Sequence, residues 1–310
     1  MKNAKREYGI GLEMEGFIVN GERAVERIDG LPASQWTAEQ IAKHSPQIRD
    51  GISFEQASVM LEVKTPVRNT EDEAVKELLA IRAEVDRCLA PVGAKLIFSP
   101  VMSKPFEFVA ATTDRDSRTH QLIKDWSKTT QGKDLLYATA IASMQVNDSR
   151  LFRGVPKQKR LERARRLHNL YIEHFNELDA LNRGIRDFRG KTRMDNLMKL
   201  IPTVKAERFA QAGYLDPREA ALPKTFVDIE KMKRWMMAHS GVDQFEKARS
   251  KNEHGVHAKI KRLDEEQPDV QLPWVVESRV FDAVDDEKSI KLVLATNSRL
   301  LALLESIAAA

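Results

Sequence analysis

Glutamates inside apolar, strand-like segments are the feature that most constrains this chain. In each segment the side chains alternate with the two-residue period of a β-strand, so that one face carries the acidic groups. The segments are residues 7–19 (EYGIGLEMEGFIV, with Glu13 and Glu15), residues 55–66 (EQASVMLEVKTP, with Glu62) and residues 274–282 (WVVESRVFD, with Glu277). A buried carboxylate is stable only beside a cation or with hydrogen bonds. The sequence therefore predicts a sheet with an acidic face that needs positive charge.

Length and composition limit the classes of protein to which the chain can belong. Its 310 residues, with 42% hydrophobic and 31% charged residues, are typical of a folded chain of one large domain or two ordinary ones. No apolar run approaches the about 18 residues of a membrane span, and the first ten residues contain no signal-like apolar stretch. The one cysteine, Cys88, excludes an intrachain disulfide and a multi-cysteine metal site. We expect a cytoplasmic protein without a membrane partner.

Turn and cap signals divide the chain into elements. Thr70 and Glu73 form a capping-box pattern, and apolar residues follow at helical spacing until Pro91, which predicts a helix. The other expected elements are strands at 94–99, 137–147 and 274–282 and helices at 116–128, 157–182 and 289–308. We expect a single α+β domain over residues 1–310, a curved, largely antiparallel sheet with helices packed on one face, and a helical and irregular insertion at about 150–270.

A basic block at residues 153–166 (RGVPKQKRLERARR) must be weighed as a nucleic-acid footprint. Its Lys and Arg residues lie mostly off the apolar stripe of the helix expected at 157–182. No aromatic interleaving and no known nucleic-acid module accompanies it. The solvated face of a core-packed helix is therefore the favoured interpretation, and nucleic acid is not expected as a partner.

The acidic strands favour a particular cofactor. Gathering Glu13, Glu15, Glu62 and Glu277 on one face requires counter-charge, and hard divalent ions take oxygen ligands of this kind. Magnesium held by few carboxylates keeps positions open for water and phosphate, so ATP is its expected companion. The sequence contains no Walker loop and no protein-kinase signature set.

Four short motifs occur in an order that is similar to a known family. They are GIGLEMEGFIV at 9–19, EQASVMLEVKTP at 55–66, SMQVNDS at 143–149 and VVESRVFD at 275–282. Together they resemble the glutamate-cysteine ligase and related carboxylate-amine ligase superfamily, which has a glutamine-synthetase-like catalytic domain. The resemblance implies an ATP- and Mg²⁺-dependent ligase that forms an amide bond, such as a γ-glutamyl bond, through an acyl phosphate. Its partners would be a small-molecule carboxylate and an amine or peptide acceptor.

The same resemblance implies a role for individual residues. Arg279, two residues after Glu277 and expected on its face, would be catalytic and face the transferred phosphate, together with Glu62. Gln145 stands where many relatives have a metal-binding histidine; its carbonyl oxygen can bind Mg²⁺ but it holds no titrating proton. The implied metal ligands are Glu13, Glu15, Glu55, Glu62, Gln145 and Glu277, and the implied cofactor-binding residues are Arg118, Arg193 and Asn147.

Two other functions are compatible with these motifs. One is an ATP-dependent phosphotransferase that acts on a nitrogen acceptor. The other is a non-catalytic relative that binds a nucleotide or a protein, in which Gln145 marks the loss of activity. ATP turnover that depends on a carboxylate would exclude the second.

Overall fold

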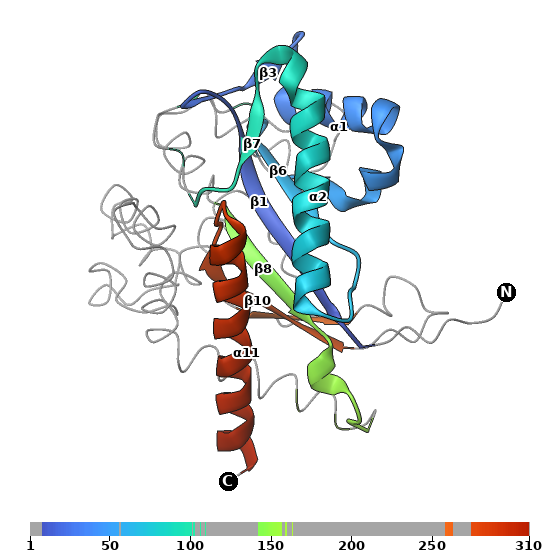
Figure 1. Cartoon of the computed structure of the whole chain (residues 1–310), viewed down its shortest axis with the longest axis vertical. Coiled ribbons are helices and arrows are strands. Elements are labelled where there is room, and N and C mark those ends of the chain that lie inside the picture. Colours follow the sequence, from blue (N-terminus) through green and yellow to red (C-terminus); the bar gives the residue numbers. More distant parts are fainter. Residues whose placement is uncertain are drawn as a thin grey trace, which may run out of the picture.

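The protein is seen in a computed structural model (Figure 1). The structure describes residues 8–100 except Gln56, then 142–156, 258–262 and 274–309, and the single residues Met102, Phe106, Val109, Lys159 and Arg163. The helix expected at 116–128, Arg118, Arg193 and most of the expected insertion lie outside the described residues. The helix expected at 157–182 does too, apart from Lys159 and Arg163.

A sheet of eight strands forms the centre of the described fold. The main path runs β5-β6-β1-β8-β10-β9, and β2 and β7 also pair with β1. Every pairing in this sheet is antiparallel, as expected. The strands are β1 (Ile10–Asn20), β2 (Arg23–Ala24), β5 (Ile52–Phe54), β6 (Met60–Lys64), β7 (Lys95–Ile97), β8 (Ser143–Asp148), β9 (Ala258–Arg262) and β10 (Trp274–Asp282). A separate hairpin pairs β3 (Arg27–Ile28) with β4 (Leu31–Pro32).

Two long helices, α2 (Glu71–Leu89) and α11 (Glu287–Ala309), lie across one face of this sheet (Figure 1). The apolar side of β1 faces them, and its Ile10, Leu12 and Met14 are fully buried. The remaining helical segments are α1 (Ala33–His44), which packs against α2, and the short 3₁₀ turns η1 (Pro46–Gly51), η2 (Ala90–Val92) and η3 (Arg150–Phe152). The described residues thus confirm the α+β class, with an antiparallel sheet and α2 and α11 on one of its faces.

Helix α2 begins where the capping box predicted. The hydroxyl of Thr70 accepts a hydrogen bond from the backbone N–H of Glu73 at 3.2 Å, and the Glu73 carboxylate accepts one from the N–H of Thr70 at 3.3 Å. These two contacts satisfy N–H groups that the first turn of a helix leaves without a partner. Helix α2 then covers the centre of the sheet and fixes its apolar face.

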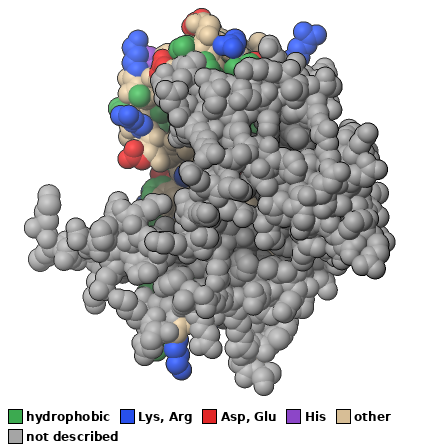
Figure 2. Space-filling view, turned by 180° about the vertical axis from the view of Figure 1, so that it is seen from behind, with side chains coloured by type: hydrophobic (Ala, Val, Ile, Leu, Met, Phe, Trp, Pro, Cys, Tyr) green, Lys and Arg blue, Asp and Glu red, His purple; other side chains and the backbone are tan. Residues whose placement is uncertain are grey.

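Two observations on the described residues bear on possible partners. Seen from behind, basic, acidic and apolar side chains lie intermixed on the described surface at the top of the molecule (Figure 2). Within the part of the chain that the structure describes, none of the helices combines the length and the apolar character that crossing a lipid bilayer requires. The described surface in this view therefore carries basic charge mixed with other side chains.

A bulge interrupts the alternation of β10. Ser278 lies opposite Val146 of β8, but Phe281 lies opposite Met144, so β10 has one residue more than β8 in this stretch. Strict alternation would put Phe281 on the face of Glu277, whereas it is fully buried in the core. Arg279 lies within the shift, so the pairing does not place it on the face of Glu277.

Candidate metal centre

The face of the sheet turned away from α2 and α11 carries the acidic groups. Residues opposite each other in an antiparallel ladder project from the same face, so the register decides which side chains meet. The register pairs Glu15 with Glu62, Glu13 with Gln145, and Glu277 with Asn147. We call these six residues the acidic face. Four strands that are distant in sequence therefore bring together the groups that the alternation predicted for one side.

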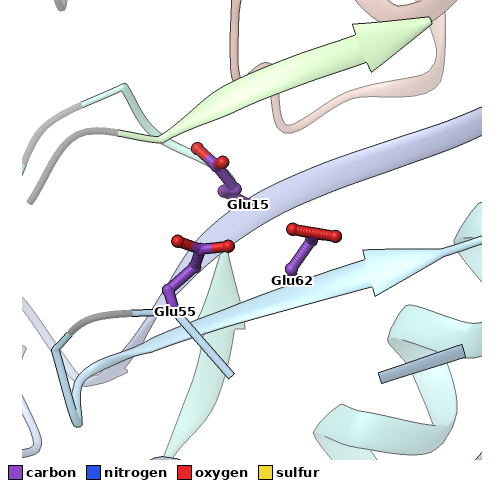
Figure 3. A group of neighbouring side chains, drawn as sticks. All are labelled: Glu15, Glu55 and Glu62. Carbon is purple, nitrogen blue, oxygen red and sulfur yellow. The ribbon is translucent and has the colours of Figure 1, made fainter. Parts of the chain in front are cut away.

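Three carboxylates of this region form a close cluster, the glutamate triad of Glu15, Glu55 and Glu62. One oxygen of each lies within 4.8 Å of an oxygen of the others, and Figure 3 shows the three side chains as close neighbours. Glu15 comes from β1, Glu62 from β6, and Glu55 from the segment between β5 and β6. Glu62 is only 6% exposed, and the other two are half-buried.

Crowding of like charges changes the protonation of the triad. Burial raises the pKa of Glu55 well above its usual value of 4.5, and the charges of Glu15 and Glu62 raise it further. A hydrogen bond between the carboxyl groups of Glu55 and Glu62 acts in the same direction. Glu55 therefore keeps its proton to a higher pH than an ordinary glutamate does, and a cation that uses all three carboxylates competes with that proton.

Lys64 supplies positive charge at the edge of the triad. Its ammonium Nζ lies 2.5 Å from Oε1 of Glu62, and its side chain is 38% exposed. Burial lowers the pKa of Lys64, but the charges of Glu62 and Glu13 outweigh that effect, and the pKa of Lys64 is raised. Alternation along β6 puts Lys64 on the face of Glu62, and the ion pair shows that it acts as the counter-charge.

Strand β8 fixes the orientation of Glu15. The backbone N–H and the hydroxyl of Ser143 donate to its Oε2 at 2.6 and 2.9 Å, and Nε2 of Gln145 donates to its Oε1 at 3.0 Å. The other amide atom, Oε1 of Gln145, is buried and has no hydrogen-bond partner. Turning the amide over would set its oxygen against the Glu15 carboxylate, so the amide orientation is decided by charge. Gln145 therefore presents its amide N–H group, and not its carbonyl oxygen, to Glu15.

A second group of polar side chains continues the acidic face toward β10. Asn147 donates through Nδ2 to Oε1 of Glu13 at 3.0 Å, and it lies opposite the fully buried Glu277. The bulge in β10 adds Asp282, which lies opposite Ser143 and is 1% exposed. Sequence analysis missed Asp282 because a single extra residue in the strand reverses the face that alternation assigns to it.

The predicted site residues fall into three sets. The triad contains Glu15, Glu55 and Glu62, and Gln145 contacts it directly. Glu13, Asn147 and Glu277 lie beside it on the same face. The backbone of Arg279 belongs to β10, whereas Arg118 and Arg193 lie outside the described residues.

The donor set of the triad fits a hard divalent cation. Three carboxylates and one amide carbonyl are all oxygen donors, which Mg²⁺ prefers, and none of them is a thiolate or an imidazole. Buried polar atoms in folded proteins nearly always have a partner, and Oε1 of Gln145 is one of several buried side-chain oxygens of the described residues without a hydrogen bond. The residues present therefore fit magnesium.

Comparison with known proteins gives structural similarities of low score. No family model matches the chain, and no curated protein matches it. A glutamate–cysteine ligase from Francisella tularensis, solved in complex with AMP, is 13% identical over 57% of this chain and 34% of its own, with a TM-score of 0.41. A bifunctional glutathione synthetase from Pasteurella multocida is 16% identical over 92% of this chain and 37% of its own, with a TM-score of 0.44. The chain spans little more than a third of either protein.

Proposed function

We propose that this protein is an ATP- and Mg²⁺-dependent ligase that joins a small-molecule carboxylate to an amine or peptide acceptor. The observation that carries the proposal is the glutamate triad, in which one oxygen of each of the three carboxylates lies within 4.8 Å of the others. The four sequence motifs that resemble the carboxylate-amine ligase superfamily support the choice of reaction. They contain every residue of the triad and of the acidic face.

The residues of the acidic face divide between two metal positions in this proposal. Glu15, Glu55 and Glu62 would hold one Mg²⁺, which the carbonyl of Gln145 would join after its amide turns over, and Glu13 and Glu277 would hold another, with Asn147 fixing Glu13. Bound magnesium neutralises the charge of the ATP phosphates and aligns the phosphoryl group that is transferred. The chain itself contributes a rigid sheet, in which Ser143 and Gln145 fix the Glu15 carboxylate by hydrogen bonds.

The reaction needs no covalent bond to the enzyme. An oxygen of the substrate carboxylate attacks the γ-phosphorus of ATP, the bond to the bridging oxygen breaks, and ADP leaves an acyl phosphate. The nitrogen of the amine then attacks the acyl carbon, phosphate leaves, and a carboxylate or water takes the proton from nitrogen. In the proposal the side chain of Arg279 would reach the transferred phosphate from the bulge of β10, although the pairing does not place it on the acidic face, and Arg118, Arg193 and Asn147 would contact the nucleotide.

The test is ADP release from Mg²⁺-ATP, screened over amino-acid carboxylates with and without amine acceptors. The wild type should turn over only with both substrates, and Glu62→Gln should abolish turnover. Glu39→Gln, an exposed glutamate on α1, is the matched control and should keep full activity. Full activity in Glu62→Gln would refute the assignment of the site.

Two results would replace the ligase by one of the alternatives. Transfer of the γ-phosphate to a nitrogen acceptor, without amide formation, would identify a phosphotransferase. Magnesium-dependent binding of ATP without turnover over a broad panel would identify a non-catalytic relative, with Gln145 in place of the histidine as its cause.

A further inference from the structure

We propose that the ammonium group of Lys64 competes with the metal for Glu62. Once the metal binds, the Lys64 side chain moves and its ammonium group pairs with a phosphate held at the same site. The inference rests on the proposed metal site. It adds a phosphate-binding residue that neither the motifs nor the donor set of the site assigns.

The geometry places the ammonium on a ligand atom. Nζ of Lys64 lies 2.5 Å from Oε1 of Glu62, one of the carboxylates of the triad. Lys64 is the last residue of β6 and lies opposite Glu13, so its side chain starts from the same face. Lys64 therefore lies opposite Glu13 and in contact with Glu62, at the end of the strand that carries Glu62.

The side chains of Glu62 and Lys64 differ in conformational freedom. Glu62 belongs to the middle of β6 and its side chain is 8% exposed, so it is held in place. The side chain of Lys64 is 38% exposed, and its four-carbon stem has several rotatable bonds. When a divalent cation binds Glu62, it repels the ammonium group of Lys64. Because Glu62 is held in place, Lys64 is the side chain that moves.

The displaced ammonium then needs an anion within reach of its stem. The carboxylates around it are the proposed ligands of the metal, which neutralises them when it binds. A phosphate bound to that metal brings new negative charge to the same place. An ammonium group with three donors is well suited to phosphate oxygens as a point charge. The class of ligand is therefore a phosphate chain, and its binding should depend on Lys64 only when the metal is present.

Two affinities measured on the same variants test the exchange. The first is the affinity for Mg²⁺ alone, by titration calorimetry. The second is the affinity for tripolyphosphate in saturating Mg²⁺. The variants are Lys64→Met, which removes the charge, Lys64→Arg, which keeps it, and the control Lys76→Met, an exposed lysine of α2.

The two affinities should change in opposite directions. Lys64→Met should bind Mg²⁺ about fivefold more tightly, because a competing charge is gone, and should bind tripolyphosphate about fivefold more weakly. Lys64→Arg and Lys76→Met should stay close to the wild type in both. A merely structural role of Lys64 would weaken both affinities together.

The outcomes separate this inference from the proposed function. In one outcome the wild type binds Mg²⁺, Glu62→Gln does not bind it, and Lys64→Met has the same two affinities as the wild type. This outcome refutes the role of Lys64 and supports the metal site. If Lys64→Met weakens both affinities, the exchange is likewise refuted. If the wild type binds no Mg²⁺, the metal site and the inference fall together.

Discussion

Magnesium affinity should depend on pH through Glu55. Burial, together with the charges of Glu15 and Glu62, holds the pKa of Glu55 well above 4.5, so metal-free protein keeps this proton to a higher pH than an ordinary glutamate would. Only the ionised carboxylate can bind a metal ion, so binding must release this proton. Lowering the pH through the raised pKa of Glu55 should therefore weaken Mg²⁺ binding.

The magnitude follows from the number of protons released. While Glu55 is protonated, one proton leaves for each ion bound, and the dissociation constant should rise about tenfold for each unit of pH lost. Above the raised pKa of Glu55 this group releases no proton, and its contribution to the pH dependence should end. The slope therefore reports the number of protons released, and the pH at which the slope ends reports the pKa of Glu55.

Titration calorimetry over a pH series, in two buffers of different ionisation enthalpy, counts the protons. Glu55→Gln should remove the proton release and the slope, at the cost of affinity. The raised pKa of Glu55 has the opposite effect on the stability of the metal-free protein, which it increases at low pH. A raised carboxyl pKa contributes stability to metal-free protein that is complete below the ordinary value near 4.5 and is lost as the pH rises through the raised pKa. Metal-free Glu55→Gln should accordingly gain stability over the wild type at high pH.

A dissociation constant that does not change with pH, with no proton released in either buffer, would refute the shared proton in the triad. Equal slopes for the wild type and Glu55→Gln would show that another group carries the dependence.

Three substitutions test the fold around the site by the free energy of unfolding in denaturant. Arg150→Met should cost about 3 kcal/mol, because Asp148, only 3% exposed, loses the guanidinium group that pairs with it at 2.7 Å. Thr70→Ala should cost about 1 kcal/mol through the loss of the helix cap. Gly16→Ala should cost about 1–3 kcal/mol, since the added Cβ would lie 2.8 Å from a backbone oxygen of β7.

Each of these variants has a matched control. Arg153→Met removes an exposed arginine three residues away, Thr70→Ser keeps the capping oxygen, and Gly11→Ala adds a Cβ whose nearest neighbour is 3.7 Å away. All three controls should stay within about 0.5 kcal/mol of the wild type. A control that loses as much as its partner would mean that the stated contact is not the cause.

Sequence alternation predicted the parts of the site that lie on regular strands. Glu15 and Glu62 meet because each occupies the acidic face of its strand and β1 pairs with β6 in the register that sets them opposite. The bounds expected for β10, residues 274–282, are those observed. Glu55 is different, because it precedes β6 in a segment without alternation, and only the family resemblance pointed to it.

Two features of the fold had no usable signal in the sequence. Helix α1 was not predicted, because Pro32 provides no capping side chain and the buried side of the helix includes Ser34, Gln35 and Thr37 instead of an apolar stripe. The bulge in β10 was not predicted either, because an inserted residue leaves the composition of a strand unchanged. Its consequence is that Asp282 lies opposite Ser143 while Phe281 enters the core.

The most direct test of the metal centre is a titration with Mn²⁺, a paramagnetic substitute for Mg²⁺, followed by electron paramagnetic resonance at neutral pH. The wild type should bind the ion, and Glu62→Gln should bind it more than about tenfold more weakly at the triad. The control Asp50→Asn, an exposed acid of η1, should bind it as the wild type does. Equal affinity in the wild type and Glu62→Gln would contradict the assignment of the triad as a metal site.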